Sequence, residues 1–231
     1  MERKIFQHTG YFGLGGIMNT SIVRYILGSV LKIEGGLLLL PVITGLIYGE
    51  SEGYTYFLVA LLCFFVGLLF TRRKPKNNIF YLKEGCISTA MSWILLSFFG
   101  AIPFFATGEI PNFMDALFET VSGFTTTGAS ILNDVESLSH TSLLWRSFTH
   151  WIGGMGVLVF LLAVIPMSGG SNINLMRAES PGPSVGKLAP KMKTSALLLY
   201  KIYIFLTALE FVLLLICRMR VFDAICLSFG T

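Results

Sequence analysis

The stretch Asn112 to Ser130 reads NFMDALFETVSGFTTTGAS and lies between two long apolar segments. Asn112 follows a proline and is a good helix N-cap, and the acidic Asp115 stands three positions later, as in a capping box. From Phe113 to Gly123 apolar side chains recur at helical spacing, which predicts a helix of about 16 Å, roughly half a bilayer. The stretch therefore predicts a half-helix that enters a membrane without crossing it.

A run of hydroxyl residues and a glycine follows the half-helix, Phe124-Thr125-Thr126-Thr127-Gly128. The three β-branched threonines favour extended backbone, and glycine reaches conformations that are closed to other residues. An extended run after a half-helix can aim a row of carbonyls at a dehydrated cation, which is how a potassium filter works. We therefore predict that Thr125, Thr126, Thr127 and Gly128 form a cation filter; the alternative is an extracellular threonine-rich turn.

The composition is that of an integral membrane protein. Of the 231 residues, 54% are hydrophobic and 13% are charged, whereas a soluble domain carries about 25% charged residues. Several apolar runs approach or exceed the length of a membrane-spanning helix, and the sequence lacks the alternation of a membrane β-barrel. The net charge of +4 comes from basic residues beside apolar runs, which indicates membrane topology and not nucleic-acid binding.

The apolar runs predict an all-α, polytopic membrane protein. We expect a cytoplasmic N-terminal segment, two leading transmembrane helices, a basic cytoplasmic loop, a first pore repeat, a second cytoplasmic loop and an incomplete second repeat; these cover residues 1–24, 25–71, 72–86, 87–166, 167–194 and 195–231. The re-entrant filter loop covers 107–142. Basic and acidic loops alternate, so the positive-inside rule places the N-terminus in the cytoplasm and the filter loop outside.

The sequence also contains an internal repeat. A shift of 108 residues places Met114-Asp115-Ala116-Leu117-Phe118 on Phe222-Asp223-Ala224-Ile225-Cys226, and Thr231 on Gly123. One helix–half-helix–filter–helix unit is then complete, and a second unit stops before its filter. Internal repeats in membrane proteins mark a pore or site on the repeat axis. We therefore expect a fragment, or a truncated reading frame, of a longer transporter, whose natural start is either Met1 or Met18.

Together these motifs resemble the Trk/Ktr/HKT superfamily of potassium transporters, and most closely the bacterial Trk-type pore-forming subunit. The resemblance runs from about Asn19 to the last residue and rests on the half-helix and threonine run, and on three further motifs: Trp145-Arg146-Ser147, Trp151-Ile152-Gly153-Gly154-Met155-Gly156 and Ala178-Glu179-Ser180-Pro181-Gly182-Pro183. It implies potassium uptake across the bacterial inner membrane, with K⁺ held by backbone oxygens of Thr126, Thr127 and Gly128 and no covalent cofactor. It also implies four pore repeats around one axis, a homodimer, and a cytoplasmic nucleotide-binding regulatory subunit.

We expect Glu119, Gly123 and Arg146 to support the filter. Glu119 lies in the middle of the half-helix, where we interpret it as a partner of Arg146 or of a backbone amide of the filter loop; the alternative is an electrostatic sink near the ion. His150 follows Arg146 by one helical turn and either braces the filter or couples transport to protons. The glycines between 153 and 156 are expected to let a neighbouring helix or the pore loop approach closely, with a gating hinge as the alternative.

Two ionisable residues, Lys32 and Glu34, fall inside the first predicted span. We expect them to lie near the cytoplasmic interface or to contact other helices; the alternative is that Glu34 lines a cation path. The four cysteines show no CxxC spacing and are interpreted as reduced and structural. The stretch Ser180-Pro181-Gly182-Pro183-Ser184 is either a docking site for a regulatory subunit or a plain linker.

The predicted function is potassium uptake through a carbonyl-lined filter. One alternative is a sodium-preferring or poorly selective cation pathway of the same architecture, because the full Thr-Val-Gly-Tyr-Gly filter of potassium channels is absent from the sequence. Another is a truncated remnant that does not conduct. A membrane enzyme would need a nucleophile with a general base, or an HExxH metal site, inside the spans, and the sequence contains neither pattern.

Overall fold

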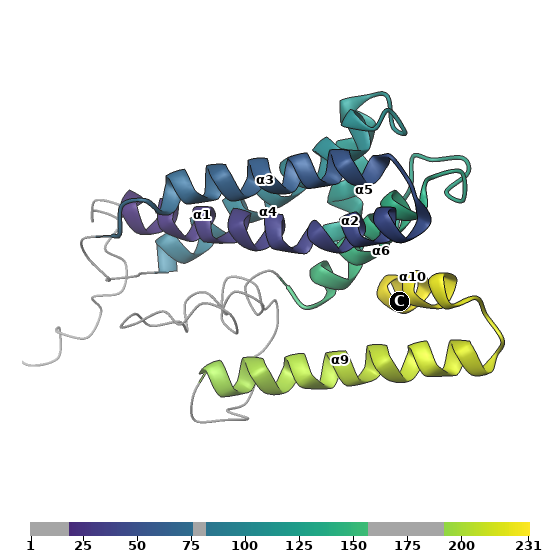
Figure 1. The fold of residues 1–231 in the computed structure, drawn as a ribbon. Helices are drawn as coiled ribbons and strands as arrows, with labels where there is room; N and C mark the ends of the chain where they lie inside the picture. Colours follow the sequence, from purple (N-terminus) through teal and green to yellow (C-terminus); the bar gives the residue numbers. More distant parts are fainter. Residues whose placement is uncertain (1–18, 76–81, 157–191) are drawn as a thin grey trace, which may run out of the picture.

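The structure is a computed structural model that describes residues 19–75, 82–156 and 192–231 (Figure 1). The motif at 178–183 and the stretch 180–184 lie outside the described residues. The described part is built from helices: α1 (Thr20–Leu37), α2 (Leu39–Tyr48), α3 (Glu52–Thr71), α4 (Leu82–Ala106), α5 (Phe113–Phe124), α6 (His140–Gly154), α9 (Met192–Ile216) and α10 (Val221–Gly230). Within the described residues, four helical segments are long and apolar enough to cross a membrane. The predicted all-α, polytopic fold is confirmed.

The first span is one long helix with a break in its second half. It runs from Thr20 to Tyr48 and divides into α1 and α2 at Leu38, whose backbone stays right-handed helical. Pro41 lies in the first turn of α2 and has no N–H to donate to the carbonyl of Leu37, which is where α1 ends. α1 and α2 lie in line with each other, alongside α3 (Figure 1).

Small residues let α1 and α3 pack closely. A Cβ added to Gly28 would lie 2.5 Å from Cβ of Phe70, and one added to Gly67 would lie 2.6 Å from the carbonyl oxygen of Gly28. Close backbone approach of this kind is how helices associate where lipid supplies no hydrophobic driving force. The two leading helices therefore form a tight hairpin, on which α4 also packs.

Two helices begin earlier than the sequence predicted. α1 begins at Thr20, inside the expected N-terminal segment 1–24, and α4 begins at Leu82, inside the expected loop 72–86. Hydropathy locates the apolar middle of a helix, whereas backbone hydrogen bonding extends the helix into polar sequence at its ends. The backbone N–H of Asn19 donates to the Glu84 carboxylate at 3.1 Å, so these two polar ends meet.

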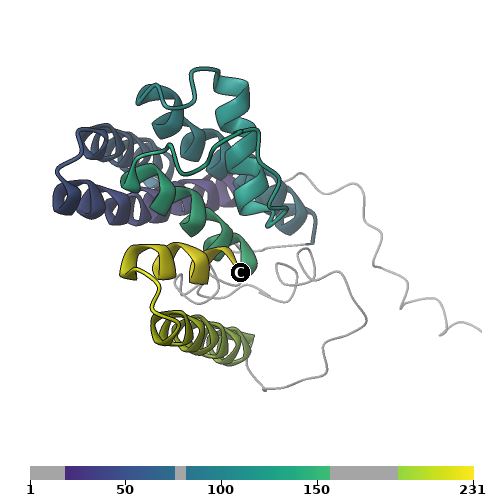
Figure 2. The same cartoon turned by 90° about the vertical axis from the view of Figure 1, so that its right-hand side faces the viewer.

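The later spans follow the prediction less completely. α6 begins at His140 and ends at Gly154, so it covers the first part of the span expected at 143–166, and the part beyond residue 156 lies outside the described residues. α9 begins three residues before the expected start of the last span and is followed, after a short turn, by α10. α10 packs on α6 and on α9 (Figure 2).

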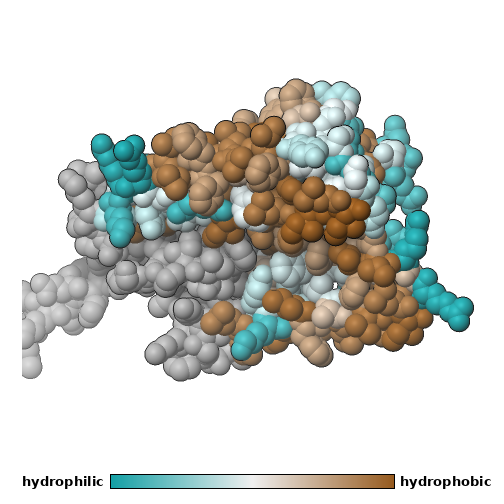
Figure 3. Space-filling model, in the orientation of Figure 1, coloured by the Kyte–Doolittle hydropathy of each residue, from teal (hydrophilic) through white to brown (hydrophobic). Residues whose placement is uncertain are grey.

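The molecular surface is strongly apolar along the helices (Figure 3). Large exposed apolar side chains are concentrated on α2, α3 and α9, and none of the most apolar window of α9 is buried. Such surfaces are unfavourable in water and suit contact with lipid or with further helices. The protein is therefore a membrane protein with several apolar spans.

Candidate functional site

The half-helix α5 begins as the sequence predicted. Asn112 is extended and its side chain accepts a hydrogen bond from the backbone N–H of Met114 at 3.0 Å, so it is the N-cap. α5 then runs to Phe124, one residue beyond the expected end at Gly123, and is about 18 Å long. Ala116, Thr120 and Phe124 are buried, and the helix packs mainly on α4 and α6.

The threonine run does not continue from α5 as extended backbone, which corrects the prediction for Thr125 and Thr126. Thr125 has φ −84° and ψ 0°, and Thr126 has a left-handed φ of 55°. The N–H of Thr127 donates to the carbonyl of Ser122, and the N–H of Thr126 to that of Gly123, both at 2.9 Å. This pair of bonds is a Schellman cap, which satisfies carbonyls that the helix end would otherwise leave without donors.

The segment after the cap folds back over the end of the half-helix. Gly128 has a φ of 73°, and no atom lies within 4 Å of the position that a Cβ would take. The predicted need for a glycine conformation at this position is confirmed. The hydroxyl of Ser122 donates to the carbonyl of Ala129 at 2.6 Å, and the hydroxyl of Thr126 donates to the carbonyl of Thr125 at 2.7 Å.

Glu119 joins three segments around this loop. The residue is 2% exposed, and its carboxylate accepts hydrogen bonds from the backbone N–H of Ile131 at 2.7 Å and from the hydroxyl of Ser130. Nε of Arg146 lies 3.1 Å from the other carboxylate oxygen. Both partners weighed from the sequence, the arginine and a backbone amide, are therefore present at once. The carboxylate holds together the half-helix, the segment after the threonine run, and α6.

Glycines bring α6 against the end of the half-helix. A Cβ on Gly123 would lie 2.1 Å from the Thr149 hydroxyl, and one on Gly153 would lie 2.2 Å from the carbonyl oxygen of Phe124. A Cβ on Gly154 would lie 2.5 Å from the Tyr203 hydroxyl of α9. The close approach predicted for this glycine cluster is therefore present.

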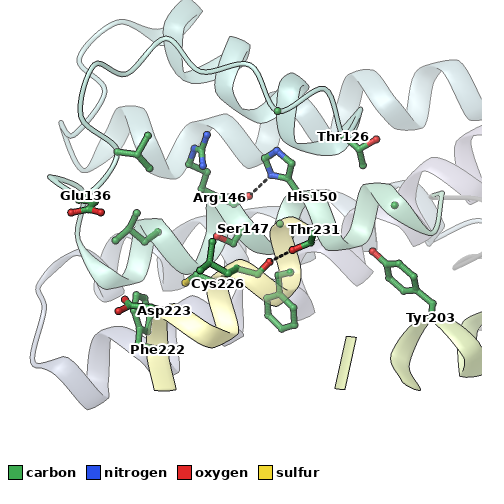
Figure 4. Close-up of a pocket in the computed structure, with 17 residues that line it drawn as sticks. Thr126, Glu136, Arg146, Ser147, His150, Tyr203, Phe222, Asp223, Cys226 and Thr231 are labelled. Atoms are coloured by element: carbon green, nitrogen blue, oxygen red, sulfur yellow. Dashed lines mark hydrogen bonds between the residues drawn. The ribbon is translucent and has the colours of Figure 1, made fainter. Parts of the chain in front are cut away.

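A cavity of about 800 Å³ lies between α6, α9, α10 and residues 125–128, which the sequence predicts to be a filter and which are called the filter segment from here on (Figure 4). Its lining includes Thr126 and Gly128 of the filter segment, Arg146 and His150 of α6, Tyr203 of α9 and Asp223 of α10. Nδ1 of His150 donates to the carbonyl of Arg146 at 3.0 Å, which orients the ring. Of the residues predicted to contact or support the ion, the cavity brings together Thr126, Gly128 and Arg146.

The remaining predicted residues lie beside this cavity. Thr125, Thr127, Gly123 and Glu119 are not among the residues that line it, although Thr125 and Thr127 share a hydroxyl–hydroxyl hydrogen bond of 2.8 Å. Within the described residues, no group of three or more His, Cys, Asp or Glu side chains could hold a metal ion. The chemistry available here is therefore that of backbone carbonyls, hydroxyls and a few charges.

Two carboxylates that sequence reasoning did not assign hold the start of α6. One oxygen of Glu50 accepts from the N–H of His140 at 2.9 Å and contacts its Nδ1 at 2.8 Å. The other accepts from the N–H and hydroxyl of Thr141 at 2.9 and 2.7 Å. Glu109 accepts from the N–H of Ser139 at 2.6 Å and from the hydroxyl of Ser142.

These carboxylates supply the negative charge that the first turn of α6 lacks. That turn contains no acidic residue, although negative charge is favoured at a helix N-terminus. Partial burial alone raises the pKa of the Glu50 carboxyl, but the hydrogen bonds from Thr141 and His140 outweigh burial, so that the pKa is lowered. The missing acid was a signal in the sequence, but it did not reveal which distant carboxylates would supply the charge.

An aromatic group lies beside these carboxylates, at one corner of the structure. The rings of Tyr48 and His140 stack with centroids 4.0 Å apart, and the ring of Phe222 of α10 is in a T-shaped arrangement with both. The turn between α2 and α3, the start of α6 and the start of α10 thus converge at one point. This corner positions α6, which carries Arg146 toward the filter segment.

The comparisons with known proteins agree with this architecture. The family model TrkH, described as a cation transport protein, matches residues 51–227. The Trk system potassium uptake protein TrkH of Escherichia coli K12 is 34% identical over 219 residues, which are 93% of this chain and 45% of that protein. The Trk system potassium uptake protein TrkG of the same strain is 35% identical over 221 residues, with the same shares covered.

A solved structure is also similar. The crystal structure of the potassium transporter TrkH from Vibrio parahaemolyticus superposes with a TM-score of 0.74 at 28% sequence identity, over 92% of this chain and 42% of that one. The chain therefore spans less than half the length of these relatives.

Proposed function

This chain belongs to the TrkH family of cation transport proteins, and from that premise we propose that it forms part of the potassium pathway of a Trk-type transporter in the plasma membrane. The observation that carries the proposal is the half-helix α5, which is capped at Asn112 and ends at a folded Thr-Thr-Thr-Gly segment beside a cavity. Relatives named as potassium uptake proteins make K⁺ the proposed ion.

The backbone oxygens of Thr126, Thr127 and Gly128 are the proposed ligands of K⁺. Carbonyl oxygens replace the water shell of the ion in filters of this kind. The C-terminal end of α5 carries the negative end of the helix dipole and lies at this segment, which favours a cation there. Glu119, Gly123 and Arg146 then act as the support of the filter, through the contacts described above.

A complete ring of carbonyls requires more than one filter segment, and the arrangement of α9 and α10 supports further repeats. α10 begins at Val221, which is 108 residues after α5 begins at Phe113, the shift seen in the sequence. α10 also lies against α6, as a neighbouring repeat around a shared axis would. Four repeats, a homodimer and a cytoplasmic nucleotide-binding subunit complete the proposal, with the N-terminus in the cytoplasm.

One observation favours a second candidate, a poorly selective cation pathway. The Thr126 hydroxyl donates a hydrogen bond to the carbonyl of Thr125, so this oxygen is less available as a fourth ligand beside the three proposed ones. The number and field strength of the coordinating carbonyls influence how well a filter distinguishes ions.

The test is ion uptake by a bacterium that lacks its own potassium uptake systems and expresses the complete reading frame containing this chain. Rescue of growth on limiting potassium, with K⁺ taken up in preference to Na⁺, is the expected result. Equal uptake of the two ions would establish the poorly selective pathway. Absence of uptake from a protein that is inserted in the membrane would contradict both candidates.

A further inference from the structure

Glu34 is a buried acid that the proposed pathway does not use. It lies in the middle of the first membrane span, Thr20–Tyr48, and the residue is 1% exposed. Among the residues that the structure describes, neither carboxyl oxygen has a hydrogen-bond partner. Glu34 is also not among the residues that line the cavity beside the filter segment.

The carboxyl of Glu34 lies where α1 and the half-helix meet at a glycine of α4. A Cβ added to Gly100 would lie 3.3 Å from Oε1 of Glu34, 2.9 Å from Cγ2 of Thr120 and 3.2 Å from the Phe124 ring. Thr120 and Phe124 belong to the C-terminal half of α5. Glu34 therefore lies behind the half-helix, close to the end that leads into the filter segment.

Two donors near Gly100 are engaged with backbone carbonyls and not with Glu34. The Thr120 hydroxyl donates to the carbonyl of Ala116 at 2.8 Å, and the Trp145 indole donates to the carbonyl of Gly100 at 3.0 Å. Because both donors bond to backbone carbonyls, the carboxyl of Glu34 is surrounded by methyl, ring and backbone atoms.

Among the described residues, the titratable groups near Glu34 bring it no positive charge. Lys32 of α1 directs its stem to α3, since a Cβ on Gly67 would lie 2.7 Å from Cγ of Lys32. The titratable group that faces Glu34 from α3 is the thiol of Cys63. The contacts from α4 and α5, Gly100, Thr120 and Phe124, carry no charge.

Two physical effects oppose an ionised carboxylate in this place. An unpaired charge inside the hydrocarbon region is costly, and the C-terminal half of a helix such as α5 carries partial negative charge. A dehydrated metal cation would need several oxygen ligands, whereas the side chains of α5 beside Glu34 offer a methyl carbon of Thr120 and ring carbons of Phe124. The ligand that the site suits is a proton.

We propose that Glu34 is a proton-binding site between α1, α4 and α5, and that loss of its proton displaces the half-helix and the filter segment attached to it. When the O–H bond breaks, the proton passes to water and an unpaired negative charge remains against α5. The bound proton thus keeps the half-helix seated on α4.

The first test is infrared spectroscopy of the full transporter in liposomes. At neutral pH the wild type should show the C=O stretch of a protonated carboxylic acid, and Glu34→Gln should lose this band. Glu34→Asp, which keeps an acid in place, should shift the band, and it also serves if Glu34→Gln fails to fold. Glu136→Gln, at an exposed carboxylate, is the control that leaves the band unchanged. A wild-type spectrum without such a band would overturn the proton site.

The second test asks whether the proton acts on the filter. The ratio of K⁺ to Na⁺ uptake should fall in the wild type as pH rises through the titration of the band, and should stay independent of pH in Glu34→Gln. A band that titrates while the wild-type ratio stays constant would overturn the link to the filter. The infrared band is measured without transport, so its absence would leave the proposed potassium pathway standing.

Discussion

Nε of Arg146 lies 3.1 Å from Oε2 of Glu119, and this ion pair joins α6 to the half-helix. The Glu119 side chain is 1% exposed and that of Arg146 is 18% exposed, so the pair is largely shielded from solvent. The same carboxylate accepts the backbone N–H of Ile131. One buried charge therefore fixes both flanks of the filter segment.

Replacing Glu119 by glutamine should loosen the filter segment. Glu119→Gln leaves Arg146 without its charged partner, which costs about 3 kcal/mol when a buried pair is broken. We expect a lower thermal unfolding temperature in detergent and a reduced ratio of K⁺ to Na⁺ uptake. Asp134→Asn, at an exposed carboxylate of the loop before α6 that does not line the cavity, is the control; equal effects of the two substitutions would contradict the role of Glu119.

An alanine at Gly153 should separate α6 from the half-helix. The new Cβ would lie 2.2 Å from the Phe124 carbonyl oxygen, and relief of such overpacking costs about 1–3 kcal/mol. Gly36→Ala is the matched control, because Gly36 is also helical and no atom lies within 4 Å of its Cβ position. The thermal unfolding temperature and ion uptake should both fall in Gly153→Ala and stay unchanged in Gly36→Ala. A fully active Gly153→Ala protein would show that this contact is dispensable.

The hydrogen bonds between the Glu50 carboxylate and the start of α6 should stabilise the fold to an extent that depends on pH. The pKa of Glu50 is lowered in the folded protein, so its contribution is present above the unfolded value, about 4.3, and is lost as pH falls through the folded value. Glu50→Gln should cost about 2 kcal/mol near neutral pH, and the difference from wild type should shrink in acid. Melting curves of both proteins from neutral to acid pH test whether the difference in stability falls as expected.

The neighbouring Glu52 provides the control for that experiment. Its carboxylate accepts a hydrogen bond of 3.3 Å from Ser51 and belongs to the same acidic turn. Glu52→Gln should change the melting temperature little at any pH. If the difference in melting temperature between wild type and Glu50→Gln stayed constant down to acid pH, it would contradict a stabilising role for the ionised Glu50 carboxylate.

Local sequence signals predicted the elements of this site, and tertiary contacts decided its details. Asn112 was recognisable as an N-cap, and Gly128 as a glycine position, because both depend on neighbouring residues alone. The prediction of extended backbone for the threonine run was wrong at Thr125 and Thr126. β-branching favours extended backbone, whereas the end of α5 forms a Schellman cap in which Thr126 is left-handed. The helix starts at Thr20 and Leu82 were missed because hydropathy follows lipid contact and not hydrogen bonding.

The contacts of Glu50 and Glu109 with the start of α6 could not be predicted from the sequence for a different reason. Glu50 and Glu109 read only as members of acidic outer loops, since each meets its partners on α6 across a long stretch of chain. Glu34 was noticed as an ionisable residue in a span, but its lack of partners became visible only when α4 and α5 were placed around it.

The proposed orientation in the membrane can be tested with single cysteines in a protein without its four native cysteines. Lys74→Cys and Asn133→Cys both place the thiol at an exposed residue, after α3 and before α6 respectively. The positive-inside rule predicts that a membrane-impermeant thiol reagent added to intact cells modifies Asn133→Cys but not Lys74→Cys. Modification of Lys74→Cys in intact cells would reverse the orientation.

The central claim is that Gly128 belongs to a cation filter, and a matched pair of glycine substitutions tests it most directly. Gly128 and Gly108 both have positive φ, 73° and 80°, and neither Cβ position has an atom within 4 Å, so a serine meets similar backbone strain at each. The measurement is the ratio of K⁺ to Na⁺ uptake in cells expressing each variant of the complete transporter. Gly128→Ser should lower this ratio about tenfold, or about 1.4 kcal/mol, while Gly108→Ser leaves it unchanged. A ratio that is unchanged in Gly128→Ser, or lowered equally in both variants, would contradict the filter.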